Sequence, residues 1–516
     1  MNKTTSTRTL HLSALSFLVS SVLITSAHAD AVTDWNDYTI KATKGFDGAT
    51  GTGVTLNSNL SSRIEAIEAR AVFDAVNSID HFSATSYYFS GSNSGSPAAA
   101  AIQAAHDVLL SQLPDPTVTG STADARWSQT RTWLDTQLSA DLGALGVAAN
   151  DGGIQAGKDA ALAAVNARKY DNASLNTTYG ATLIPTSNPG IGLWRQSNGG
   201  ADKIDSSTGA PTGFDSTGSI ILGKAGIDFN WRDVTPFSLT HHQKVKLVAA
   251  VPLCPEVGSQ EYLEELDYVK NYGQDSSAVR SPDQTAQALY YKIDAELFIN
   301  EVARIASNAR NFSLDENAKL FAALGNAIAD TRIAAFDSKY EQKFWRPITA
   351  INADEDGAVT NNYAAWHPLA ATPSHPSNTA GHSATGAAGF EILRAFFGDK
   401  IKPNGAAVTL GTLPWLTGTN SGTGNISSRT VKSFTQAQLE NGASRLYLGV
   451  HFGYDNLQGQ LLGLSVADTI IQSSHDPATE GLTVKKDSAG SYSKIKKTLL
   501  KKPELYGYFG QITETP

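Results

Sequence analysis

Three motifs decide the fold of this chain: KYEQKFWRP (residues 339–347), HPSNTAGHS (residues 375–383) and SRLYLGVHFGYD (residues 444–455). Together they can offer two arginines, one lysine and two histidines to a single point. Such a set of cations and imidazoles suits the binding and activation of a tetrahedral oxyanion.

In the first motif, Lys339 and Arg346 stand seven residues apart. This spacing is two helical turns, so we expect both side chains on one face of a helix that Pro347 ends. Lysine brings a point charge and arginine a planar fork that matches two oxygens of an oxyanion. Taken alone, this common spacing favours two solvated basic residues on a helix surface.

The second motif predicts that Gly381 and His382 open a helix over residues 383–397. The N-terminus of a helix has unpaired N–H groups and a positive dipole end, which together favour an anion. Gly381 lets the backbone approach a ligand, and His382 is suited to general acid–base catalysis. The alternative is a histidine that only caps the helix.

In the third motif, Asp455 follows His451 by four residues, and Arg445 precedes it by six. In a helical turn Asp455 would accept one imidazole N–H and leave the other nitrogen free as ligand or nucleophile. A zinc site built on His367, His375, His382 and His451 is excluded because these spacings match no zinc pattern. A serine hydrolase is excluded because no Gly-x-Ser-x-Gly motif is present.

Hydrophobic periodicity along the chain predicts an all-α fold with long irregular connections. We expect helices over residues 60–78, 96–113, 123–145, 153–168, 260–272, 283–307, 315–345, 383–397, 436–448 and 455–471. Residues 31–57 read as an irregular arm. Residues 172–233 read as a long excursion with a strand-like stretch at 219–222. The predicted organisation is an N-terminal helical half (30–240), a C-terminal bundle with the oxyanion site (241–480) and a lysine-rich tail (481–516).

Residues 1–29 have the pattern of a secretory signal, which predicts a secreted or periplasmic protein. Removing them takes away Lys3 and Arg8 and no acid, so the net charge changes from −9 to −11. This charge argues against a nucleic-acid partner, and no later segment is long and apolar enough to span a bilayer. Cys254 is the only cysteine, so an intrachain disulfide is excluded.

The three motifs, in this order, resemble the signature shared by vanadium-dependent haloperoxidases and type 2 phosphatidic acid phosphatases. That signature is Lys-x6-Arg-Pro, then Pro-Ser-Gly-His, then Ser-Arg-x5-His. The N-terminal half is similar to the haloperoxidase branch, in stretches such as RAVFDAVNSID (residues 70–80) and WRDVTPF (residues 231–237). The resemblance covers nearly all of the chain after residue 29. It implies a fold of two helical-bundle halves and a peroxidase that uses vanadate, hydrogen peroxide, a halide and a small organic acceptor.

The resemblance also implies a role for each matched residue. Lys339, Arg346 and Arg445 would bind the vanadate oxygens together with the backbone N–H of Gly381. His451 would be the axial ligand of vanadium, oriented by Asp455, and His382 would be the acid–base residue. In a phosphatase on the same residues, His451 would attack phosphorus and His382 would protonate the leaving group.

Two positions bear on oxyanion affinity and halide preference when the chain is compared with the family pattern. The family serine is replaced by Ala380, which removes one hydrogen bond to the oxyanion; Ser377 or Ser383 are the candidates to replace it. His375 stands where bromide-oxidising members often carry histidine, so with Trp345 it is assigned to the halide pocket, and bromide or iodide is favoured. A metal-free phosphomonoesterase, a non-catalytic oxyanion-binding protein and a homo-oligomer are the alternatives left open.

Overall fold

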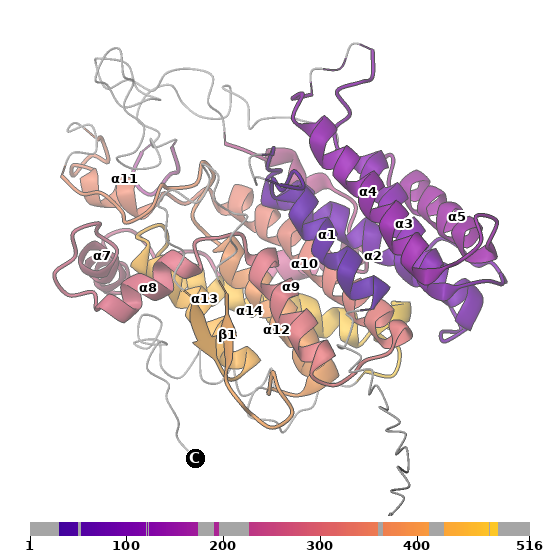
Figure 1. Ribbon diagram of the computed structural model, residues 1–516. Coiled ribbons are helices and arrows are strands. Elements are labelled where there is room, and N and C mark those ends of the chain that lie inside the picture. Colours follow the sequence, from indigo (N-terminus) through magenta and orange to yellow (C-terminus); the bar gives the residue numbers. More distant parts are fainter. Residues whose placement is uncertain are drawn as a thin grey trace, which may run out of the picture.

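The computed structural model describes residues 30–49, 53–119, 121, 123–173, 190–195, 226–359, 365–411, 428–473 and 475–482. These residues form a mostly helical protein (Figure 1). The α-helices of the first half are α1 (Ala31–Thr43), α2 (Ser58–Asp80), α3 (Pro97–Gln112), α4 (Trp127–Leu145) and α5 (Gly152–Ala167). The later α-helices are α6 (His241–Ala249), α7 (Gln260–Tyr272), α8 (Pro282–Tyr290), α9 (Ala295–Asn308), α10 (Leu314–Gln342), α11 (Pro347–Asn352), α12 (Gly381–Phe397), α13 (Phe434–Tyr447) and α14 (Gly453–Ile471). The prediction of an all-α fold is confirmed, with one small addition: an antiparallel pair of strands, β1 (Val408–Leu410) and β2 (Arg429–Val431).

Most of these helices begin where a short polar side chain can accept an N–H of the first turn. The residues that do so are Asp30, Asn57, Ser96, Asp151, Thr240, Ser259, Ser281, Ser313 and Ser433. The helices that start with Ala380 and Phe452 at the cap position have no such side chain. Both of these helices carry site residues, so their first turns depend on groups from elsewhere in the fold.

The long helix α10 lies between the two halves (Figure 1). The helices α1–α5 gather on one side of it, and the later helices lie on the other. One hydrophobic cluster runs through both sides and is built from alanine, branched aliphatic and aromatic side chains. It contains no methionine, because the only methionine of the chain is Met1. Since α10 is buried along almost its whole length, it fixes Lys339, near its C-terminal end, deep inside the protein.

The helices α12 and α14 pack so closely that their first turns are brought together. A Cβ added at Gly459 in α14 would lie 2.6 Å from the carbonyl oxygen of Ala380, and one at Gly463 would lie 2.0 Å from that of Ala384. Only glycine allows this approach. The backbone N–H of Ala380 also donates to the carbonyl oxygen of Asp455 at 3.0 Å. The predicted anion cradle of α12 is therefore joined directly to the His451–Asp455 region.

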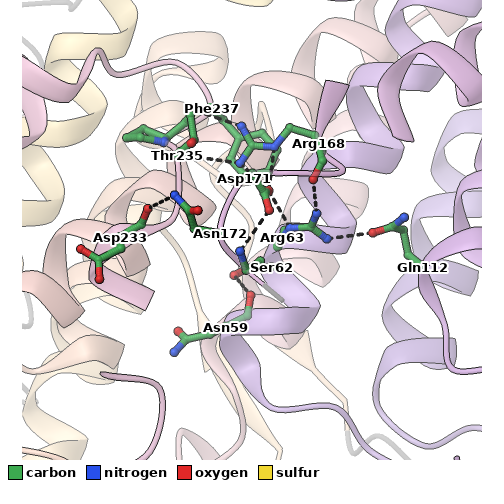
Figure 2. A network of polar contacts seen from close by, with 12 residues as sticks. Asn59, Ser62, Arg63, Gln112, Arg168, Asp171, Asn172, Asp233, Thr235 and Phe237 are labelled. Carbon is green, nitrogen blue, oxygen red and sulfur yellow. Dashed lines mark hydrogen bonds and ion pairs between the residues drawn. The ribbon is translucent and has the colours of Figure 1, made fainter. Parts of the chain in front are cut away.

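The described residues at the two ends of the segment 172–233 meet at a network of polar contacts (Figure 2). Asp171 accepts hydrogen bonds from Arg63 Nε at 2.8 Å and Arg168 Nε at 2.9 Å. The Thr235 N–H donates to the Asp171 carbonyl at 2.9 Å, and the Asn172 amide donates to the Asp233 carbonyl at 3.0 Å. The strand-like stretch 219–222 lies outside the described residues, as do residues 1–29 and all but the first two residues of the lysine-rich tail.

Four predicted segments were wrong in detail. Residues 31–43 form helix α1 rather than an irregular arm, because Asp30 caps it. The single helix expected over 283–307 is two helices, α8 and α9, separated at residues 291–294. The helix expected over 315–345 ends at Gln342, where Lys343 adopts a left-handed conformation. The helix expected from residue 123 begins at Trp127.

Within the described ranges, no helix combines the length and the apolar character that crossing a lipid bilayer requires.

The buried carboxyl group of Glu68 predicts a pH dependence of stability. Glu68 is 3% exposed in α2, and burial raises its pKa from 4.5 to about 8. Between these values the folded state keeps a proton that the unfolded chain has released, so stability falls as the pH rises, by about 1.4 kcal/mol for each pKa unit. We expect Glu68→Gln to flatten the unfolding free energy between pH 5 and pH 8, measured by denaturant titration. The exposed Glu264→Gln is the matched control, and an unchanged slope in Glu68→Gln would contradict the assignment.

Candidate functional site

The site lies where the ends of five helices converge. Lys339 stands in the last turn of α10 and Arg445 in the last turn of α13. Arg346 caps α11, Gly381 and His382 begin α12, and His451 and Asp455 lie on either side of the start of α14. The three cations are buried: Lys339 and Arg346 are 0% exposed and Arg445 is 4% exposed. The structure thus brings together all three motifs.

Arg346 does not continue the helix of Lys339, contrary to the prediction from their spacing. Helix α10 ends at Gln342, four residues before Arg346, and Pro347 begins a new helix. Proline is favoured in this first helical position because it has no N–H to lose there. The turn between the two helices is held by described residues of the excursion: Trp194 N–H donates to the Lys343 carbonyl at 2.7 Å, and Trp345 N–H to the Gly192 carbonyl at 2.9 Å.

The Arg346 guanidinium is the centre of a hydrogen-bond network. Its Nε donates to the His375 carbonyl at 2.9 Å, and its Nη1 to the Val450 carbonyl at 2.7 Å. Nη1 also lies 3.0 Å from His451 Nε2, and Nη2 lies 2.9 Å from His375 Nδ1. Because arginine can only donate, His451 Nε2 acts as an acceptor in this contact. His375 Nδ1 also lies 3.2 Å from the Pro376 carbonyl oxygen, so the tautomer of His375 decides which of the two contacts it makes. Burial lowers the pKa of Arg346 to about 9, which still leaves it charged near neutral pH.

Lys339 is fixed by two backbone carbonyl oxygens of the second motif. Its Nζ donates to Pro376 O and to Ser377 O, each at 2.9 Å. Burial, followed by the charge of Arg346, holds the pKa of Lys339 well below its ordinary value. A buried cation beside other cations is costly, and a bound anion would offset that cost.

His451 and Asp455 form the pair that the sequence predicted. His451 Nδ1 lies 3.0 Å from Asp455 Oδ2, which also accepts the Phe452 N–H at 3.0 Å and the Ser377 hydroxyl. The Nδ1 proton therefore points to the carboxylate, and Nε2 has the lone pair that faces Arg346. Burial holds the pKa of His451 well below its ordinary value, with Arg346 the next contribution. Burial also raises the pKa of Asp455 to about 6.

Arg445 is the cation without a partner among the described residues. Its Nε and Nη1 atoms are buried and make no hydrogen bond there. Burial lowers its pKa to about 10. Buried donors are nearly always satisfied, so two unsatisfied N–H groups on one buried guanidinium indicate a missing acceptor. This is the clearest mark of an anion site in the structure.

Gly381 and His382 form the first turn of α12 as predicted. A Cβ added at Gly381 would meet only Lys339 Cε, at 4.0 Å, so the space beside its backbone opens toward the lysine. The half-buried His382 donates from Nε2 to the Ile293 carbonyl at 3.1 Å, which leaves Nδ1 as the free nitrogen. Burial, followed by the charge of Arg445, holds the pKa of His382 well below its ordinary value.

The two residues assigned to the halide pocket occupy different environments. His375 is half-buried, with its ring 5.1 Å from that of Phe336, and Arg346 ties it to the oxyanion site. Trp345 is 3% exposed in an aromatic cluster with Phe344, Phe452 and Tyr454, and its Nε1 makes no hydrogen bond to the described residues. His375 is therefore in contact with the oxyanion-binding residues, whereas Trp345 packs in the adjacent core.

The structure also shows what surrounds Ala380, where the family pattern has serine. The Ser377 hydroxyl is bound to Asp455 and is not available to an oxyanion. The Ser383 hydroxyl is buried without a described partner, but its Cβ would lie 3.1 Å from a Cβ added at Gly459, so it faces α14. Neither serine takes the place of the absent hydroxyl at the cap of α12.

We expect Ala380→Ser to strengthen oxyanion binding. A hydroxyl at this position can accept an N–H of the first turn of α12 and donate to the oxyanion, which should add about 1.5–3 kcal/mol of affinity, or about tenfold or more. Isothermal titration with orthovanadate and with phosphate would measure the gain. Ala384→Ser, one turn further along the same helix, is the control, and equal affinities for Ala380→Ser and the unaltered protein would contradict the prediction.

Some residues that build the site carried no signal in the sequence. Asn441 in α13 donates to the His382 carbonyl at 2.8 Å, and Glu265 in α7 accepts the Gly453 N–H at 2.6 Å. Both contacts join residues far apart in the chain. Among the residues that the structure describes, no group of three or more histidine, cysteine, aspartate and glutamate side chains could hold a metal ion. The geometry instead fits a tetrahedral oxyanion next to the Nε2 atom of a histidine.

Fold and site together define a class: mostly helical proteins in which buried cations and histidines are gathered at the ends of several helices. Residues 319–479 match the family described as the VCPO second helical-bundle domain. The vanadium chloroperoxidase of Curvularia inaequalis is 26% identical over 229 residues, which cover 35% of this chain and 37% of that relative. The part of the chain that carries all three motifs therefore matches a helical-bundle domain of the vanadium haloperoxidase family.

Solved structures extend this similarity of fold to most of the chain. The first bacterial vanadium-dependent iodoperoxidase superimposes with a TM-score of 0.60 at 18% identity, covering 85% of this chain and 95% of that one. A holo-type bacterial vanadium-dependent chloroperoxidase superimposes with a TM-score of 0.59 at 16% identity, covering 86% and 97%. The resemblance predicted from the motifs is therefore confirmed by the family match over residues 319–479, and the predicted fold by the solved structures over most of the chain.

Proposed function

We propose that this chain is a vanadate-dependent haloperoxidase that oxidises bromide or iodide with hydrogen peroxide to a hypohalous species, which then reacts with a small organic acceptor. The observation that carries the proposal is the Arg445 guanidinium, with two buried N–H groups that have no described acceptor. The oxyanion vanadate offers acceptor oxygens to these groups and a metal centre to the Nε2 of His451. His375, in contact with Arg346, supports bromide or iodide as the halide.

Each residue of the site then has a defined task. Lys339, Arg346 and Arg445 compensate the negative charge of the oxyanion, and the Gly381 N–H adds a donor at the start of α12. Asp455 keeps the Nδ1 proton of His451 in place, so that Nε2 stays available as a ligand. Before His451 Nε2 can bind the metal centre, Arg346 Nη1 must turn away from it and donate to an oxygen of the ligand instead. When bound, vanadate would supply a Lewis acid that activates hydrogen peroxide toward halide.

His382 is positioned to move the proton that the reaction requires. Its Nε2 is occupied by the Ile293 carbonyl, so Nδ1 would accept or donate the proton beside the Arg445 side of the pocket. Its lowered pKa leaves it neutral near pH 7, ready to act first as a base.

The test is a bromination assay on chelator-stripped protein with hydrogen peroxide, before and after addition of orthovanadate. Activity that depends on orthovanadate and is suppressed by phosphate would support the proposal. Absence of bromide and iodide oxidation at saturating orthovanadate would refute it. Release of phosphate from a monoester by the metal-free protein would then favour the second candidate, a phosphomonoesterase. That candidate is supported by the lone pair on Nε2 of His451, which could attack phosphorus once Arg346 Nη1 turns to a phosphate oxygen.

We propose in addition that residues 1–29 act as a secretory signal, which places the protein outside the cytoplasm. N-terminal sequencing of the exported protein tests this, with cleavage expected after Ala29. Retention of residues 1–29 on protein recovered from the periplasm or the medium would contradict it.

A further inference from the structure

Helix α14 begins without a side-chain cap of its own, although it sets the geometry of the His451–Asp455 pair. Its cap residue is Phe452, which has no polar side chain. Asp455 Oδ2 accepts the Phe452 N–H at 3.0 Å, so that donor is satisfied from within the helix. The next donor, the Gly453 N–H, is satisfied by Glu265 Oε2 at 2.6 Å, from a residue 188 positions earlier in the chain.

Glu265 is held in this position by the packing of α7. Tyr262, one turn earlier on α7, is 3% exposed and packs its ring 6.1 Å from that of Phe452. Residues three apart lie on the same face of a helix, so Tyr262 and Glu265 contact two consecutive residues of the α14 start. Burial raises the pKa of Glu265 to about 7, although the Gly453 N–H opposes the rise.

The absence of a side chain at residue 453 is a condition of this contact. A Cβ added at Gly453 would lie 2.3 Å from Glu265 Oε2 and 2.6 Å from Oε1. Any side chain there would displace the carboxyl group. The hydrogen bond from Gly453 to Glu265 therefore requires both the carboxyl group at residue 265 and the absence of a side chain at residue 453.

We propose that Glu265 is a positioning residue for His451: it caps α14 from the neighbouring helix and so holds the imidazole against Asp455. His451 lies outside α14 and Asp455 lies inside its first turn, so their 3.0 Å contact depends on how the chain enters the helix. Without the acceptor on Glu265, the Gly453 N–H has no hydrogen-bond partner, and the backbone of residues 451–453 at the start of α14 is held less firmly. The inference rests on the proposed role of His451 as the ligand of the oxyanion.

The test uses the full-length protein and two measurements. The first is the NMR signal of the His451 Nδ1 proton in protein labelled with ¹⁵N-histidine, assigned by its loss in His451→Gln. The second is the orthovanadate affinity from isothermal titration. We expect Glu265→Ala and Gly453→Ala to lose the protected signal and to bind orthovanadate at least about tenfold more weakly, because they disturb the His451–Asp455 contact that orients the proposed ligand. Glu265→Gln, which keeps an acceptor oxygen, should restore both.

Glu264→Ala is the matched control, because Glu264 is the exposed neighbour on the same helix. The inference is overturned if Glu265→Ala keeps both the signal and the affinity, or if Glu265→Gln behaves like Glu265→Ala. Gly453→Ala keeps the test decisive if Glu265→Ala fails to fold. A wild-type protein that shows the signal but binds no orthovanadate would refute the proposed function, while the NMR comparison would still decide the role of Glu265.

Discussion

Replacing Arg445 by methionine should abolish oxyanion binding and at the same time stabilise the ligand-free protein. The two unpartnered N–H groups of Arg445 are charge-assisted donors, each worth about 1.5–3 kcal/mol to a bound anion. Their loss predicts a weakening of at least about a hundredfold. In the absence of a ligand the same groups are buried and unsatisfied, so an apolar side chain of similar length should raise the free energy of unfolding by about 1–3 kcal/mol.

A loss of anion affinity together with a gain in the free energy of unfolding is expected for a binding residue but not for a structural one. Orthovanadate and phosphate titrations measure the first effect, and denaturant unfolding without either anion measures the second. Arg126→Met, on the exposed Arg126, is the control and should change neither quantity. Unchanged anion affinity in Arg445→Met would show that the site is assigned to the wrong residues.

Replacing Asp455 by asparagine should cost about ten- to a hundredfold in halide oxidation, the usual effect of changing the partner of a ligating histidine. The His451 Nδ1 proton, the Phe452 N–H and the Ser377 hydroxyl all point to the same oxygen, Oδ2, so asparagine keeps these three hydrogen bonds only with its amide oxygen in that place. This neutral oxygen is a weaker acceptor than the carboxylate, so His451 Nε2 becomes a weaker ligand. The amide NH2 would then occupy the place of Oδ1, which is buried without a partner among the described residues.

Asp455→Ala tests the structural side of the same residue. It leaves three buried donors unsatisfied, at about 1–3 kcal/mol each, so a loss of several kcal/mol is expected in addition to the loss of activity. Asp468→Asn, in the same helix, is the control for the asparagine variant. Full activity of Asp455→Asn with orthovanadate present would exclude a role for the carboxylate charge.

The sequence predicted those parts of the site that depend on local spacing. Asp455 follows His451 by one helical turn, so a helical start to α14 was enough to bring them together. Arg346 shows the limit of the same reasoning, because Pro347 can end one helix or begin another, and the spacing from Lys339 fits both. The break between α8 and α9 was missed because the hydrophobic pattern continues through residues 291–294.

The remaining contacts could not be predicted because they are made by backbone groups or by distant residues. Lys339 is fixed by two carbonyl oxygens, which every residue has and no pattern marks. Glu265 is one of several acids on an ordinary amphipathic helix, and only the tertiary packing of α7 on α14 distinguishes it.

The core of this protein, built from alanine, branched aliphatic and aromatic side chains, has a consequence for its durability. Two-electron oxidants convert methionine to a polar sulfoxide that disrupts packed interiors, and the described core has no thioether to lose. The thiol of Cys254 is half-buried, and burial raises its pKa, so little reactive thiolate is present. Under the proposed function this chain would release hypohalous acid. The described core would then hold no methionine for that product to oxidise.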